Sequence, residues 1–126
     1  MTISLQAEFF ETAPGEHHVQ LRFADSIIQC TPEDVSALIA ALADIRQQLQ
    51  PPIPTELRTG QTIATEAAPA FYTEPNDMVD GSTLVLRHAG LGWISYSVPL
   101  ESLKKLHHLF GLQIQRIESG RKPTAH

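Results

Sequence analysis

The sequence is poor in the features that most directly indicate a function class, beginning with cysteine and positive charge. Its 126 residues contain one cysteine, Cys30, which rules out an internal disulfide and a cysteine-rich zinc site. The sequence has nine basic and 14 acidic residues, which gives a formal charge of −5. A nucleic-acid-binding protein needs a basic face that displaces counterions from phosphates. We therefore expect no nucleic-acid partner.

Long apolar runs and metal-binding patterns are also missing from the sequence. No apolar run approaches the roughly 18 residues that span a bilayer, and the opening residues do not resemble a secretion signal. The histidine pairs His17–His18 and His107–His108 are adjacent in sequence, so their rings point in different directions on a strand or a helix. We expect no membrane partner, no metal, no cofactor and a cytoplasmic location.

The composition is that of an ordinary globular protein, with 42% apolar and 18% charged residues, and its length suits one domain. The first half shows strand patterns near residues 3–10, 19–24 and 27–30. A helix is predicted to begin at Thr31-Pro32, because threonine caps helices and proline suits the first helical position. Prolines 51–54 then end the helix.

The second half shows the same order of patterns after an irregular connector. Strand patterns lie near residues 69–74, 83–89 and 93–98, and a helix is predicted from about residue 99 to 110. Gly111 is placed as its C-terminal cap, and the alternation in residues 112–117 predicts a short final strand. The glycines of "AGLG" (residues 89–92) indicate a hairpin, since no lysine follows as it does in a phosphate-binding loop.

The two halves resemble each other in element order and in a few residues, for example "VQLRFA" (residues 19–24) and "LVLRHA" (residues 84–89). The sequence therefore predicts an α+β fold of internally duplicated β-β-β-α units, which form a mainly antiparallel sheet with two helices packed on one face. Chance similarity is the alternative. The predicted single domain covers residues 1–126: repeat 1 at about 3–50, connector at about 51–68, repeat 2 at about 69–118 and a loose tail at 119–126.

The repeat also singles out two histidines. His88 aligns with Phe23, and His107 aligns with Ile39, so two apolar positions of the first copy are polar in the second. One interpretation is a ligand-binding pocket formed by His88 and His107, with Trp93 and Tyr96 as its walls. The stronger interpretation is structural: His88 lies beside a turn and is satisfied by a backbone carbonyl, and Trp93 belongs to the core.

Cys30 is the best nucleophile that the sequence offers, because it directly precedes a predicted helix start, where a thiol pKa can be lowered. The default for such a cysteine is a small buried apolar residue. No orienting histidine or carboxylate is recognisable near it, so no catalytic residue is assigned.

These observations favour a non-catalytic small acidic binding or assembly module that acts through protein–protein contacts as a homodimer. The alternative is a small-ligand-binding protein with the second-repeat pocket, and a small enzyme is the weakest interpretation. Exposed edge strands support a dimer, because pairing them across two copies hides their backbone groups.

Overall fold

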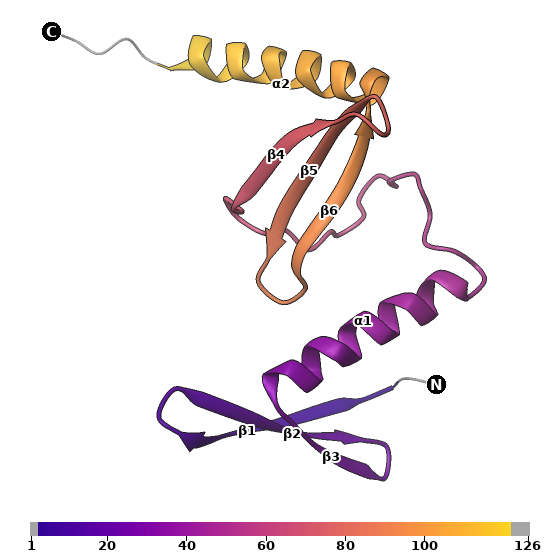
Figure 1. The fold of residues 1–126 in the computed structure, drawn as a ribbon, viewed down its shortest axis with the longest axis vertical. Coiled ribbons are helices and arrows are strands. Elements are labelled where there is room, and N and C mark those ends of the chain that lie inside the picture. The colour runs from indigo at the N-terminus through magenta and orange to yellow at the C-terminus, as the bar shows by residue number, and fades with distance from the viewer. Residues whose placement is uncertain (1–2, 122–126) are drawn as a thin grey trace, which may run out of the picture. The chain divides into compact units, whose positions relative to one another are not determined.

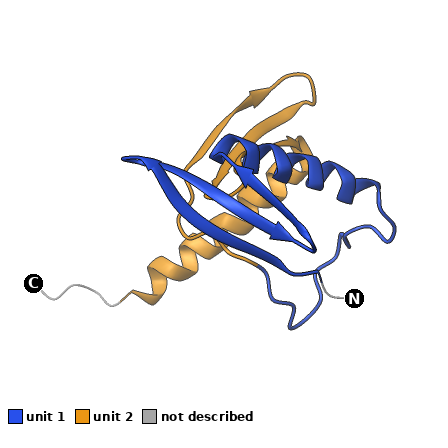
Figure 2. Ribbon diagram, turned by 90° about the horizontal axis from the view of Figure 1, so that it is seen from below, with its two compact units in different colours: residues 1–63 blue, residues 64–126 orange. Residues whose placement is uncertain are grey.

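The computed structural model describes residues 3–121 of the chain. The chain divides into two compact units, Met1–Ile63 and Ala64–His126 (Figure 2). This boundary falls inside the predicted connector. Each unit has the element order β-β-β-α.

Unit 1 is a three-stranded antiparallel meander followed by a helix (Figure 1). Its elements are β1 (Leu5–Ala13), β2 (Glu16–Phe23), β3 (Ser26–Cys30) and α1 (Pro32–Gln48). The turns depend on left-handed backbone conformations, with φ of 80° at Gly15 and 54° at Ala24. Glycine reaches this region without the steric cost that a side chain adds.

Helix α1 begins where the sequence predicts, because Thr31 forms a capping box with Asp34. The Thr31 hydroxyl accepts from the Asp34 backbone N–H at 3.1 Å, and the Asp34 carboxylate accepts from the Thr31 backbone N–H at 3.0 Å. Two donors that the first helical turn leaves unpaired are thereby satisfied. Pro32 occupies the first helical position, where its missing N–H costs nothing.

Unit 2 repeats this order as β4 (Phe71–Asn76), β5 (Gly81–His88), β6 (Gly92–Pro99) and α2 (Leu100–Gly120). Its three strands form a second antiparallel sheet in the order β4-β5-β6. Strand β6 passes directly into α2, and the backbone N–H of Leu100 donates to the Asp80 carbonyl at 3.1 Å. The start of α2 is therefore attached to the turn between β4 and β5.

The α+β class and the order of elements confirm the sequence-based fold prediction, with two differences in detail. The described strands form two three-stranded sheets rather than one. Helix α2 continues through Gly111 to Gly120, so the predicted cap at Gly111 and the predicted strand at 112–117 are wrong. An internal glycine costs a helix only about 1 kcal/mol, and Phe110, Ile114 and Ile117 continue its apolar spacing.

The duplication itself stays a prediction, because the strand contacts do not by themselves establish it. The predicted tail at 119–126 begins inside α2, whose last residues are helical. Residues 122–126 lie outside the described part of the chain. Neither helix in residues 3–121 is long and apolar enough to cross a membrane.

Neither unit by itself encloses a core. Among the described hydrophobic residues, only Val19 and Cys30 are buried, with 8% and 3% of their surface exposed. Helix α1 contacts β2 and β3, and α2 contacts β5 and β6. These contacts leave much of the apolar surface of both units uncovered. The exposed apolar residues of the two helices are Leu38, Leu42, Ile45, Leu100, Leu109, Phe110, Leu112, Ile114 and Ile117.

Candidate functional site

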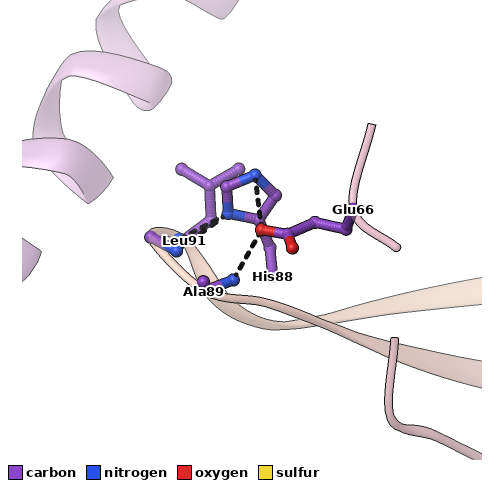
Figure 3. Close-up of polar contacts among 5 residues, drawn as sticks. Glu66, His88, Ala89 and Leu91 are labelled. Carbon is purple, nitrogen blue, oxygen red and sulfur yellow. Dashed lines mark hydrogen bonds and ion pairs between the residues drawn. The ribbon is translucent and has the colours of Figure 1, made fainter. Parts of the chain in front are cut away.

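His88 organises the turn between β5 and β6. Its Nδ1 accepts from the backbone N–H groups of Gly90 and Leu91, both at 3.0 Å (Figure 3). The ring is 38% exposed. A side-chain acceptor that bonds amides two and three residues ahead holds a turn in the way that aspartate and asparagine often do. The structural interpretation of His88 therefore has a specific basis, with backbone N–H groups as the partners.

Glu66 completes this arrangement from the irregular segment that precedes β4. Its Oε1 accepts from the Ala89 backbone N–H at 2.9 Å and lies 3.4 Å from His88 Nε2 (Figure 3). Because Nδ1 accepts two bonds, the proton of the neutral ring resides on Nε2 and faces this carboxylate. One glutamate and one histidine thus fix all three amides of the turn.

The strand register separates Trp93 from the histidine. His88 pairs with Gly92, Trp93 pairs with Arg87, and Tyr96 pairs with Leu84. Alternate residues of a strand point to opposite faces, so His88 and Tyr96 share one face of the sheet and Trp93 lies on the other. Trp93 is 57% exposed, and its predicted place in a core is not found within unit 2.

His107, the fourth residue of the predicted pocket, lies on α2 and is exposed. The sheet therefore gathers two of the four pocket residues on one face and places Trp93 on the opposite face. Ligand binding by these residues stays a prediction, and the register gives it no common cavity.

Cys30 ends β3 and is 3% exposed. The thiol is therefore largely shielded from solvent, as expected for a small buried apolar residue. Among residues 3–121 there is no group of three or more histidine, cysteine, aspartate or glutamate side chains that could hold a metal ion.

The sheet of unit 1 has a strongly apolar face. The pairs Phe9–Val19, Val19–Cys30 and Leu21–Ile28 place apolar side chains side by side. The members of this apolar face are Leu5, Ala7, Phe9, Val19, Leu21, Phe23, Ile28 and Cys30. Several stay uncovered, with Phe9 exposed by 76% and Leu5 by 61%. Such a surface normally marks an interaction site.

Unit 2 has a corresponding apolar face on the side of its sheet that carries His88. Phe71 pairs with Leu86, and Leu86 pairs with Ile94. The face comprises Phe71, Leu84, Leu86, Ile94, Tyr96 and Val98. Phe71 is 70% exposed and Tyr96 is 50% exposed, so unit 2 leaves much of this face uncovered.

The opposite face of the unit 2 sheet is polar near β4. The Tyr72 hydroxyl donates to the Glu74 carboxylate at 2.9 Å, and this hydrogen bond raises the pKa of Tyr72. The Asn76 amide donates to the Thr83 hydroxyl at 3.0 Å and to the Ser97 hydroxyl at 3.5 Å. These bonds tie all three strands of the sheet together.

The four edge strands differ in how they are protected from pairing with another strand. β1 carries Glu8 and Glu11 and a register irregularity near its end, and β3 is only 5 residues long. β4 contains Pro75, which has no N–H to donate. β6 has no charge, no proline before its last residue and an unbroken register with β5. Charge, proline, bulges and shortness are the usual protections of an edge.

Sequence reasoning missed Glu66, and it expected an exposed apolar patch without locating the two uncovered faces. Glu66 stands more than 20 residues from its partners in a segment without periodicity, so no local pattern connects them. The alternation of β2 does reveal an apolar face, but alternation cannot show whether anything covers it. No family model, curated protein or solved structure matches this chain.

Proposed function

We propose that this protein is a non-catalytic binding or assembly module that acts through protein–protein contacts as a homodimer. The observation that carries the proposal is the apolar surface that each unit leaves uncovered. Burial of apolar surface is the main favourable term in folding and association. Within its described residues, unit 1 buries only Val19 and Cys30, so further coverage would stabilise it.

The uncovered area of unit 1 is close to what an interface requires. Phe9 and Phe23 are 76% and 45% exposed, and Leu5 and Ile28 are 61% and 50% exposed. The apolar stripe of α1 consists of the exposed residues Leu38, Leu42 and Ile45. Together with this stripe, the four side chains expose on the order of 500 Å². A standard interface buries about 800 Å² per partner, of which somewhat more than half is apolar.

The charge distribution is compatible with a second copy as the occupant. The apolar face of unit 1 carries one carboxylate, Glu11, and this contacts the cross-strand neighbour His17 at 3.1 Å. The net negative charge of the chain therefore lies away from the surface that a second copy would cover. Two-fold dimers use the same surface on both subunits, so the apolar face of unit 1 in one copy can pack against the same face of the second copy.

The alternative of a small-ligand pocket has weaker support. Trp93 lies on the face opposite His88 and Tyr96, and His88 already uses Nδ1 for the turn.

Sedimentation equilibrium of the full chain over a wide concentration range tests the proposal. We expect a dimer that dissociates only on dilution. Leu42 is 63% exposed on the apolar stripe of α1, so Leu42→Lys would place a charge in the interface and weaken the dimer by about tenfold or more. Ala40→Lys adds the same charge to the same helix, away from the stripe, and should leave dimerisation unchanged.

A chain that stays monomeric at every concentration would contradict the proposal. If Leu42→Lys and Ala40→Lys changed dimerisation equally, the apolar side of α1 would not be part of the interface. Circular dichroism of each variant shows whether its fold is retained.

A further inference from the structure

Strand β6 is the least protected edge in the described sheets. It spans eight residues, Gly92–Pro99, pairs with β5 without a register break and contains no charged residue. The other three edges carry acidic side chains with an irregular register, an internal proline or a short length. An unprotected edge of this kind pairs readily with another strand.

The sequence of β6 is suited to pairing with itself. A two-fold axis perpendicular to the sheet keeps the same faces of both sheets on one side. The axis lies between the two paired strands, level with one residue that faces its own equivalent. Centring it on Ser95 pairs seven positions, residues 92–98, and leaves out Pro99. Centring it on Tyr96 would include Pro99, which has no N–H, and centring it on Ile94 would shorten the ladder.

The Ser95-centred register also gives favourable side-chain pairs. Ile94 of one copy lies opposite Tyr96 of the other, and pairs of an aromatic and a β-branched residue stabilise antiparallel strands. Trp93 lies opposite Ser97, and Ser95 lies opposite its own equivalent. Because Ile94 and Tyr96 belong to the apolar face of unit 2, this pairing joins the two apolar faces into one continuous surface.

We infer that β6 is the contact strand between two copies of this chain, pairing antiparallel with its equivalent about Ser95 to make one six-stranded sheet. The inference rests on the proposed homodimer and adds to its apolar interface on unit 1 a second contact, the β6 edge of unit 2. It assigns Trp93 and Tyr96, which are 57% and 50% exposed, to the contact between copies.

Cysteine cross-linking of the full chain tests the register. Directly opposed residues of antiparallel strands have Cα atoms about 4.5–5.5 Å apart, which lies within the range that a disulfide bridges. We expect Ser95→Cys to form a disulfide-linked dimer under mild oxidation. Wild-type protein, whose single thiol Cys30 is 3% exposed, gives the background.

Ser97→Cys is the matched control, because it lies on the same strand and the same face. In the inferred register, the two Ser97 positions are four residues out of line, about 13 Å apart along the strands. We expect no cross-link above background. Equal cross-linking of Ser95→Cys and Ser97→Cys would overturn the inference.

Charge complementation provides a second test at the same position. Ser95→Lys and Ser95→Glu each place like charges opposite each other, which should weaken the respective homodimer about three- to fivefold. Mixing the two variants places lysine opposite glutamate and should restore dimerisation. The chain could dimerise and yet show neither the Ser95→Cys cross-link nor recovery of dimerisation on mixing. That result would overturn the β6 interface and leave the homodimer proposal intact. A monomeric wild-type chain would overturn both.

Discussion

At the scale of single residues, His88 holds the turn between β5 and β6 through hydrogen bonds to the backbone. Its Nδ1 holds two backbone amides, and Glu66 holds the third and lies beside Nε2. The repeat places His88 at the position of Phe23, but in unit 1 the corresponding turn between β2 and β3 has only two residues, Ala24 and Asp25. The longer turn of unit 2 has more amides to satisfy.

Replacing His88 by alanine should therefore destabilise the fold. The variant His88→Ala leaves the amides of Gly90 and Leu91 without their protein acceptor, at a cost of about 1–2 kcal/mol in the free energy of unfolding. His88→Asn retains an acceptor that can bond residues ahead in a turn and should recover most of this loss. Urea denaturation measures both. If both variants lost the same free energy of unfolding, the hydrogen bonds from the Gly90 and Leu91 amides would not explain the stabilising effect of His88.

The sequence indicates part of this residue-scale arrangement. A histidine beside a glycine-containing turn predicts a hydrogen bond to a backbone carbonyl, whereas the structure shows the ring accepting from the N–H groups of Gly90 and Leu91. Glu66 could not be foreseen, because its contact with Ala89 depends on the path of an irregular segment. The exposure of Trp93 could not be foreseen either, since alternation assigns a side chain to a face and does not tell what lies above that face.

At the scale of secondary-structure elements, the start of α1 depends on one carboxylate. Hydrogen bonds from the backbone and then the side chain of Thr31 lower the pKa of Asp34, and the nearby charge of His18 lowers it further. A pKa that is lower in the folded than in the unfolded state stabilises the fold above the unfolded pKa, which is about 3.9. This contribution is lost as the pH falls through the folded pKa.

Asp34→Asn should accordingly reduce the acid sensitivity of α1. Between about pH 5 and pH 2 the wild-type chain should lose helical signal, and the variant should start lower and change less over that interval. Asp44→Asn removes a carboxylate from the same helix outside the capping box and serves as the control. Circular dichroism during acid titration records all three proteins. An identical acid response of wild type and Asp34→Asn would count against the capping role.

Element boundaries were predictable where local chemistry decides them. Threonine and proline set the start of α1, and the glycine-rich turn separates β5 from β6. The end of α2 was not predictable in this way. Gly111 has the residue type of a helix cap, but the apolar spacing of Phe110, Ile114 and Ile117 extends the helix to Gly120. A periodic pattern over several turns outweighs one unfavourable residue.

At the scale of the whole molecule, the uncovered apolar surface links stability to concentration. Among the described residues only Val19 and Cys30, both in unit 1, are buried apolar residues. If folding and dimerisation are coupled for this reason, the melting temperature rises with protein concentration. Each tenfold increase in concentration should stabilise the dimer by about 1.4 kcal/mol.

Differential scanning calorimetry at several concentrations measures this dependence. We expect the melting temperature of the wild-type chain to rise with each increase in protein concentration. Leu42→Lys should melt at a lower temperature than wild type at equal concentration, and Ala40→Lys should follow wild type. A concentration-independent melting temperature for wild type would contradict the coupling.

Pro75 of β4 has a consequence for how large such an assembly can grow. When two copies pair through β6, the strands left at both margins of the six-stranded sheet are the two copies of β4. Each carries a proline that cannot donate to a further strand. In the proposed dimer this proline would oppose the addition of a third copy at either margin, and so limit growth of the sheet toward a fibril.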